Sequence, residues 1–219
     1  MLRDRTLFTD AHIIILDKPA GLAVHPGPST AHSVEYHLES LRLGFQRLPH
    51  PAHRLDRDTS GCLVLGRHPK AVKRLSGLFE SGAVTKIYWA VVAPEPVGDE
   101  GVIDAPLLKV STKADGWRMI VHPKGKPALT RWRVLERQDG RALVEFKPET
   151  GRTHQVRVHA ATLGGAILGD PVYGDGVGPM QLHARAISIP YREGAEPIIA
   201  TAEVPPHMAA LGFEAALRP

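Results

Sequence analysis

Several residue types and patterns are scarce in this 219-residue chain, and each scarcity excludes a class of protein. The single cysteine, Cys62, excludes an intrachain disulfide framework and a cysteine-based zinc cluster. Asparagine is absent, so the chain has no acceptor for N-glycosylation. No apolar run approaches the roughly 18 residues that are needed to span a bilayer. We therefore expect a protein of the reducing cytoplasm that does not enter a membrane.

The start of the chain carries charges of both signs, Arg3, Asp4 and Arg5, and has no apolar region of the kind that a secretory signal needs. The composition, 43% hydrophobic and 23% charged, is that of an ordinary globular protein. A chain of this size is expected to bury roughly 70–75% of the surface that its unfolded form exposes. Its core can therefore form without a disulfide or a structural metal.

Positive charge is concentrated in two blocks of the chain. The formal net charge is +4 at pH 7. Residues 47–74 and 102–141 each have a net charge of +5, whereas the segments around them are net acidic. Such blocks are either solvated faces or a surface that binds the phosphates of a nucleic acid.

Short apolar runs separated by glycine and proline predict a fold rich in strands. The clearest runs are residues 13–16, 62–65, 86–92, 128–135, 141–146, 182–189 and 197–204. Apolar residues at helical spacing predict helices at 34–41, 72–79 and 153–163. Because strands and helices do not alternate strictly, we expect an α+β (mixed α/β) fold with a mostly antiparallel central sheet flanked by a few helices.

Two segments of the sequence lack the pattern of a regular core element. Residues 93–101 are typical of a loop, and residues 109–126 of a hairpin or an irregular excursion. On the helix predicted at 153–163, the spacing of the apolar residues places Arg157 away from the core, where it needs a partner. No repeat or linker divides the chain, so we expect residues 1–219 to form a single domain.

The common nucleotide, metal and nucleophile motifs are missing. Gly125-Lys126 is followed by Pro127 and is not a phosphate-binding loop. His154 and His159 are five residues apart with no carboxylate between them, which does not favour a metal site. Cys62 lies in an apolar strand, where a thiol is usually inert. The residues therefore predict neither a metal nor a cofactor.

One dense polar segment remains, residues 53–61, which read HRLDRDTSG and precede the apolar run 62–65. A simple turn would explain one or two of these residues. It would not explain why cations and carboxylates gather directly before a buried strand. An aspartate beside guanidinium groups stays ionised at neutral pH, as a nucleophile must.

This segment resembles the HRLD-x-x-TSG signature of the RluA-type pseudouridine synthases, which convert specific uridines in RNA into their C-glycoside isomer. Further motifs of that family are matched in the same order, and the resemblance covers roughly residues 10 to 205. They are Lys18-Pro-Ala-Gly21 (KP-x-G), Lys86-Ile-Tyr88 (K-x-Y), residues 151–159 (GR-x-HQ-x-R-x-H), residues 169–174 (GDPVYG) and residues 182–184 (LHA). Many relatives carry an N-terminal S4-like RNA-binding domain, for which this chain has no room, so the resemblance implies one catalytic domain.

The resemblance also implies a role for individual residues. Asp56 matches the catalytic aspartate that attacks the nucleotide, and Tyr88 matches the tyrosine that packs on the uracil ring. Arg157 matches the basic residue that pairs with the aspartate. Arg54 matches the arginine that enters the RNA stack in place of the target base. Flipping a base out of a helix costs about a few kcal/mol, and a planar cation is suited to fill the gap.

The implied partner is a stem-loop of ribosomal or transfer RNA. The reaction is an isomerisation without redox change, so no cofactor and no metal are implied. No protein partner is implied either, and we expect a monomer.

Two other functions stay open from the residues alone. A non-catalytic RNA-binding or RNA-chaperone protein would keep the fold and the basic blocks. A glycosidase would need a second carboxylate near Asp56, for which Asp58 is the only nearby candidate. By themselves, Tyr88 is explained as a core aromatic of a strand and Arg157 as a surface charge of a helix.

Overall fold

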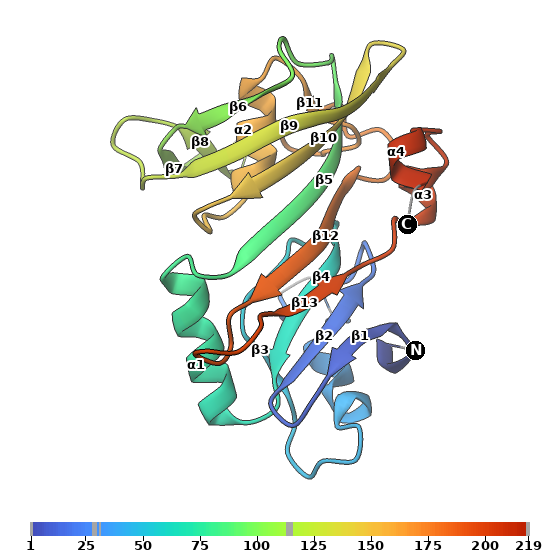
Figure 1. The fold of residues 1–219 in the computed structure, drawn as a ribbon. Coiled ribbons are helices and arrows are strands. Elements are labelled where there is room, and N and C mark those ends of the chain that lie inside the picture. Colours follow the sequence, from blue (N-terminus) through green and yellow to red (C-terminus); the bar gives the residue numbers. More distant parts are fainter. Residues whose placement is uncertain (1, 28–29, 31, 113–115, 218–219) are drawn as a thin grey trace. The chain divides into compact units, whose positions relative to one another are not determined.

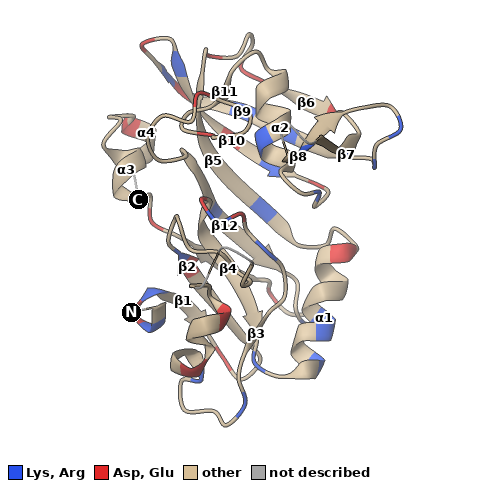
Figure 2. Ribbon diagram, turned by 180° about the vertical axis from the view of Figure 1, so that it is seen from behind, with Lys and Arg blue, Asp and Glu red and all other residues tan. Residues whose placement is uncertain are grey.

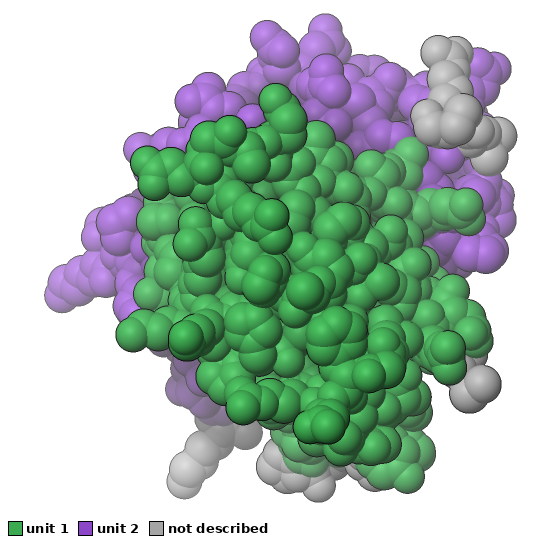
Figure 3. All heavy atoms as spheres, turned by 60° about the horizontal axis from the view of Figure 1, so that its bottom comes forward, with its two compact units in different colours: residues 1–85, 183–203 green, residues 86–182, 204–219 purple. Residues whose placement is uncertain are grey.

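The computed structural model describes residues 2–27, 30, 32–112 and 116–217 (Figure 1). The chain divides into two compact units, which Figure 3 colours separately. Unit 1 comprises Met1–Thr85 and His183–Glu203, and unit 2 comprises Lys86–Leu182 and Val204–Pro219. Each unit has its own set of strands and its own buried core clusters.

Unit 1 is a sheet with one α-helix packed on it. Its elements are η1 (Leu2–Arg5, a 3-10 helix), β1 (Thr6–Thr9), β2 (Ile13–Lys18), η2 (Glu35–Leu41, a 3-10 helix), β3 (His50–Pro51), β4 (Ser60–Gly66), α1 (Pro69–Glu80), β12 (Leu182–Ile189) and β13 (Ile198–Thr201). Its strands follow the order β1-β2-β4-β12, with β3 paired to β4 and β13 paired to β12. β4 and β12 run parallel, and the other pairs of this unit are antiparallel.

Both faces of the central strands of unit 1 are buried, which explains their continuous apolar runs. Ile13 and Val64 lie in one core cluster together with Leu75 of α1. Ile14 and Leu63, which point to the opposite face, are also fully buried. Alternation of polar and apolar residues is therefore absent from β2 and β4.

Unit 2 consists of antiparallel strands with helices packed on both of their faces. Its elements are β5 (Thr85–Ala93), β6 (Glu100–Asp104), β7 (Leu107–Thr112), β8 (Gly116–Val121), β9 (Leu129–Gln138), β10 (Arg141–Pro148), α2 (Gln155–Thr162), β11 (Ala166–Ile167), α3 (Pro206–Ala209) and α4 (Glu214–Leu217). The strands follow the order β5-β10-β9-β6, with β11 paired to β5, and β7 and β8 form a separate hairpin.

The residues of β10 show how the faces of the unit 2 sheet are used. Val144 and Phe146 pack in a core cluster with Val156 of α2. Leu143, which points the other way, packs with Met208 of α3 and with residues of α4. Figure 1 shows α2 on one side of this sheet and α3 and α4 on the other. The helix α2, which contains most of the motif at residues 151–159, is thereby packed against the strands of unit 2.

The predicted fold class is confirmed, since the strand pairs are mostly antiparallel and helices are few. All the strands predicted from the clearest apolar runs are present. The helix predicted at 34–41 is a 3-10 helix, and the hairpin predicted within 109–126 is formed by β7 and β8. Residues 113–115, at its turn, lie outside the described residues. In the described ranges, no helix has the length and apolar character that a membrane crossing requires.

Candidate active site

Asp56 lies on the loop that joins β3 to β4 in unit 1. Leu55 is 5% exposed and anchors the loop in the interior, whereas Arg54 beside it is exposed and Asp56 is half-buried. The backbone N–H of Thr59 donates a hydrogen bond of 3.2 Å to the carbonyl of Asp56, which closes a tight turn. The loop thus anchors one side chain in the core and leaves a carboxylate and a guanidinium within reach of solvent.

The side chain of Lys18 is hydrogen-bonded to the backbone of this loop. Lys18 is fully buried, and its Nζ donates hydrogen bonds to the carbonyls of Pro19 at 2.9 Å, Leu22 at 2.7 Å and Arg57 at 2.9 Å. All three N–H donors of the ammonium are therefore used. Two segments that are distant in the sequence, the KPAG turn and the loop of Asp56, are tied together by one cation.

Burial lowers the pKa of Lys18 to about 7, while the negative charges of Asp58 and Asp56 act in the opposite direction. The charge of Asp58 is itself paired, because Arg57 donates to both of its oxygens at 3.0 and 3.1 Å. A carboxylate engaged in this way is a poor second catalytic group, which weakens the glycosidase alternative.

The end of the motif fastens the loop to the neighbouring strand β12. Ser60 Oγ and His183 Nδ1 are 2.8 Å apart and both residues are buried, and His183 Nε2 lies 3.3 Å from the carbonyl of Ala202. Because a carbonyl only accepts, Nε2 carries the proton, and the Ser60 hydroxyl donates to Nδ1. Gly61 has φ +103°, and a Cβ there would lie 2.3 Å from the carbonyl oxygen of Ala184. Glycine is required at this close approach.

His53, the first residue of the motif, is structural. Its Nε2 accepts a hydrogen bond of 3.0 Å from the backbone N–H of Val64. Its ring stacks on Phe79 of α1, with the ring centroids 4.3 Å apart. The imidazole therefore connects the loop to β4 and α1.

Tyr88 lies on β5 in unit 2, opposite Phe146 of β10. It is partly buried and packs against the core cluster that contains Phe146 and Val156. Lys86, the other polar residue of the K-x-Y motif, is buried and donates from Nζ to the carbonyl of Thr150 at 3.2 Å. The motif thus combines a buried support, Lys86, with an aromatic ring that keeps part of its surface exposed.

Arg157 lies on α2 and is 5% exposed, so the prediction that it projects away from the core is wrong. Its Nε and Nη2 donate to the two carboxylate oxygens of Asp170, each at 2.7 Å. Asp170 is fully buried and also accepts the backbone N–H groups of Val172 and Tyr173. Burial by itself raises the pKa of Asp170, but the ion pair with Arg157 and the N–H groups of Val172 and Tyr173 together outweigh this effect and hold the pKa below its usual range.

The reason for this error is a buried polar network around α2. Gln155 donates from Nε2 to Thr130 Oγ1 at 2.9 Å, and its Oε1 accepts from Thr150 Oγ1 at 2.8 Å. His159 Nδ1 lies 2.8 Å from Thr130 Oγ1, and burial lowers the pKa of His159. Polar residues on α2 are therefore interior residues, which apolar periodicity cannot reveal. Gln155 and His159 stand in the matched motif, which is the only signal that marked them.

The four predicted site residues are divided between the two units. Arg54 and Asp56 lie in unit 1, and Tyr88 and Arg157 lie in unit 2. In the described part of the chain, no group of three or more His, Cys, Asp or Glu side chains is arranged to hold a metal ion. Burial raises the pKa of the Cys62 thiol to about 12, which agrees with the prediction that it is inert.

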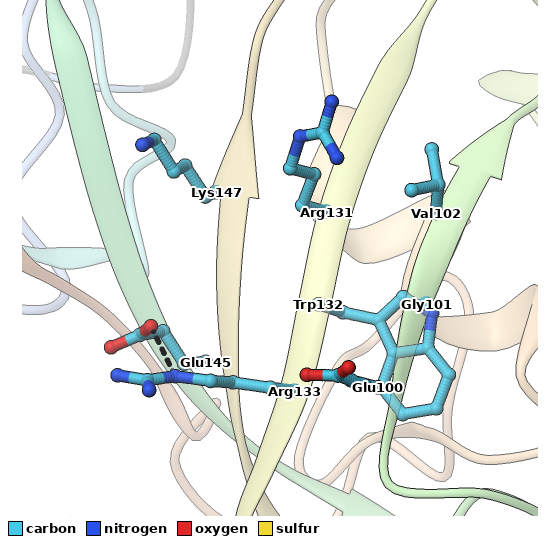
Figure 4. Close-up of a pocket in the computed structure, with 8 residues that line it drawn as sticks. All are labelled: Glu100, Gly101, Val102, Arg131, Trp132, Arg133, Glu145 and Lys147. Atoms are coloured by element: carbon cyan, nitrogen blue, oxygen red, sulfur yellow. Dashed lines mark hydrogen bonds and ion pairs between the residues drawn. The ribbon is translucent and has the colours of Figure 1, made fainter.

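A depression of about 350 Å³ lies on the exposed face of β6, β9 and β10, where the side chains shown in Figure 4 surround it. Arg133 pairs with Glu145 at 2.7 Å, and Arg131 pairs with Glu149 at 2.6 Å. Three of its five charged lining residues, Arg131, Arg133 and Glu145, are thus held in ion pairs. None of the four predicted site residues lines this depression.

Comparison with known proteins agrees with the matched motifs. The family model for RNA pseudouridylate synthases matches residues 12–162. The chain is 50% identical to an uncharacterized RNA pseudouridine synthase of Zymomonas mobilis, over 97% of this chain and 99% of that protein. It is 35% identical to ribosomal large subunit pseudouridine synthase D of the same organism, over 77% of this chain and 55% of that protein. This chain belongs to the RluA-type family of RNA pseudouridine synthases.

Solved structures of this family share the fold. The structure titled human RNA pseudouridylate synthase domain containing 4 has a TM-score of 0.80 and 26% identity, over 99% of this chain and 92% of that chain. The structure titled human RNA pseudouridylate synthase domain containing 1 has a TM-score of 0.78 and 25% identity, over 94% of this chain and 86% of that chain. The chain spans about half the length of synthase D. As a member of the RluA-type family, it is an isomerase that acts on RNA.

Proposed function

We propose that this enzyme converts specific uridines of structured RNA into pseudouridine, with Asp56 as the nucleophile. The observation that carries the proposal is the construction of the Asp56 loop. Buried Lys18, buried Leu55 and the Ser60–His183 hydrogen bond hold its backbone, while the carboxylate of Asp56 stays half-exposed. A nucleophile held in one position by rigid neighbours is what covalent catalysis needs.

The chemistry needs no added group. The bond between the ribose and a ring nitrogen of uracil breaks, the base rotates, and a bond from the ribose to a ring carbon forms. The ring carbon loses a proton and the released nitrogen gains one, so that atoms and electrons balance. The carboxylate of Asp56 attacks the nucleotide to start this exchange, and the bond that it forms breaks again before the product is released, so the carboxylate is regenerated.

We propose distinct roles for the other three residues. Tyr88 packs on the uracil ring and assists removal of the proton, because it combines an aromatic face with a hydroxyl. Arg157 supports the aspartate as a cation. Arg54, which is exposed, enters the RNA stack after the target base has flipped out.

The proposed substrate is a stem-loop of ribosomal or transfer RNA, bound by the monomeric enzyme in the cytoplasm. The basic blocks support an RNA partner. Lys70, Lys73 and Arg74 lie in the first half of α1, which has no acidic residue in its first turn (Figure 2). Lys124 and Lys126 are also exposed. Cations that form no ion pair with a described carboxylate favour a polyanion.

The function is tested by mapping pseudouridines in total RNA from cells with and without this gene. The proposal expects at least one site to lose its modification and to regain it when the wild-type gene is restored. Purified enzyme should modify the same site in an unmodified transcript. If no site changes and the purified enzyme modifies no cellular RNA, the non-catalytic RNA-binding alternative is favoured.

A salt titration tests the partner. Because each neutralised phosphate releases counterions, the logarithm of the RNA association constant should fall linearly with the logarithm of salt concentration. Changing Lys124 and Lys126 together to Ala should reduce this slope. An affinity that does not depend on salt, or an unchanged slope in the double variant, would contradict the proposed phosphate contacts.

A further inference from the structure

Trp117, near the start of β8, is a large aromatic residue that the fold leaves exposed. Its surface is 44% exposed, whereas Trp132 is 8% exposed. The hairpin is anchored by Leu107 and Met119, which belong to a core cluster with Val158 of α2. Trp117 is not a member of that cluster, so its indole is not needed to close this core.

The surroundings of Trp117 are aromatic and cationic. The ring of His154 lies 4.9 Å from the indole, centroid to centroid, at an interplanar angle of 33°. The ammonium of Lys109 lies 4.8 Å from the indole centroid. Arg118 follows directly and is exposed, and neither Lys109 nor Arg118 forms an ion pair with any acidic residue that the structure describes. A partly exposed aromatic ring beside cations that are not neutralised by a described carboxylate is the combination that binds single-stranded nucleic acid.

This cluster is connected to Arg157 through contacts within unit 2. The hydroxyl of Tyr173 accepts the backbone N–H of Met119 at 3.0 Å and lies 2.9 Å from His154 Nδ1. The guanidinium of Arg157 lies 5.2 Å from the centroid of the Tyr173 ring. Trp117 and Arg157 are therefore linked by the pair His154 and Tyr173, and the hairpin packs beside α2 (Figure 1).

We propose that Trp117 is a stacking site for an unpaired base of the RNA substrate, with Lys109 and Arg118 contacting the adjoining phosphates. The inference rests on the proposed function for the identity of the substrate, and it names the part of the RNA that is recognised. Unpaired bases of RNA loops are commonly held on aromatic side chains. An exposed cation–π contact is weaker than base stacking, so the Lys109 ammonium can leave the indole for a phosphate.

The test compares the binding of two RNA probes, a ten-nucleotide oligoadenylate and a blunt duplex of ten G·C pairs, neither of which contains uridine. Stacking on one aromatic residue corresponds to roughly a 5- to 150-fold change in Kd. Trp117→Ala should weaken oligoadenylate binding within this range, Trp117→Phe by less than about threefold, and duplex binding should change little in either variant. Binding of oligoadenylate should also quench tryptophan fluorescence in the wild type but not in Trp117→Phe.

Val121→Ala is the matched control, because Val121 is an equally exposed apolar residue of the same strand and has no place in the aromatic cluster. It should bind both probes as the wild type does. Wild-type affinity of Trp117→Ala for oligoadenylate, or an equal loss for both probes, would overturn the inference. If Trp117→Ala does not fold, the quenching experiment and Trp117→Phe decide it.

The experiments tell base stacking on Trp117 apart from the isomerisation of uridine. Both probes lack uridine, so their binding does not depend on turnover. If the wild type modifies no RNA while the Trp117 effect is observed, the proposed function fails and the stacking site stands. If the wild type modifies RNA and Trp117→Ala binds normally, only the stacking site is wrong.

Discussion

Arg157 and Asp170 form a buried pair in which the guanidinium donates to both carboxylate oxygens at 2.7 Å. Asp170 comes from the GDPVYG motif and Arg157 from α2, so the pair joins two of the matched motifs. Two N–H···O bonds in one plane fix the orientation of the guanidinium as well as its position. Asp170 is therefore a positioning residue for an arginine whose proposed role is catalytic.

The first prediction concerns this pair. Asp170→Asn should lower the free energy of unfolding by about 3–5 kcal/mol, because it leaves a buried guanidinium without its counter-charge. Replacing both residues, as Arg157→Met with Asp170→Asn, should recover most of that loss, since the site then holds no buried charge and Asn keeps an acceptor for the N–H groups of Val172 and Tyr173. Urea denaturation gives the free energies.

Activity separates the two possible roles of Arg157. If it acts in catalysis, the double variant should be stable but should form pseudouridine far more slowly than the wild type. A stable double variant with wild-type turnover would show that Arg157 is only structural.

The second prediction concerns the pH dependence of stability at Lys18. Burial lowers its pKa to about 7 in the folded protein, whereas an unfolded lysine has a pKa of about 10.4. Between pH 7 and pH 10, Lys18 is protonated in the unfolded chain but deprotonated in the folded chain. Unfolding therefore takes up a proton, and a rise in pH makes unfolding less favourable. The contribution of Lys18 to the free energy of unfolding should therefore rise from pH 7 to pH 10.

The measurement is the difference in unfolding free energy between the wild type and Lys18→Met across this pH range. That difference should grow with pH, while the same difference for Lys73→Met, at an exposed position of α1, should stay flat. A difference that is constant or falls for Lys18 would contradict the lowered pKa.

The third prediction compares two glycines. Gly61→Ala combines a φ of +103° with a Cβ 2.3 Å from a backbone oxygen, and the strained backbone alone costs about 1–3 kcal/mol. Gly77→Ala, on the exposed face of α1 with open space around it, should instead stabilise the protein by about 0.4–1 kcal/mol. Opposite shifts of the urea midpoints are expected, and equal shifts would contradict the close approach of β4 and β12.

Much of the fold was predictable because apolar runs decide where strands lie. The runs at 62–65 and 141–146 correspond to β4 and β10, extended by one or two residues at one or both ends. The edge strand β6 was missed since only Ile103 of its five residues is buried. Helices α3 and α4 have four residues each, which is too short for a helical period to be recognised.

The site was predictable to the level of its motifs but not of its contacts. Nothing in local patterning shows that Lys18 binds the carbonyl of Arg57, or that Ser60 meets His183, because these contacts join segments distant in the sequence. Arg157 was misplaced for a related reason. Its partner Asp170 lies beyond the end of α2, where spacing along the helix carries no information.

A single-turnover assay of Asp56→Asn, with excess enzyme on an RNA that the wild type modifies, tests whether Asp56 is the nucleophile. Asn is nearly isosteric with Asp, so the loop and RNA binding should be kept, while the anionic nucleophile is lost. Asp58→Asn is the matched control, since Asp58 pairs with Arg57 at the surface. We expect no pseudouridine with Asp56→Asn and near wild-type formation with Asp58→Asn. Formation near the wild-type level with Asp56→Asn would show that Asp56 is not the nucleophile.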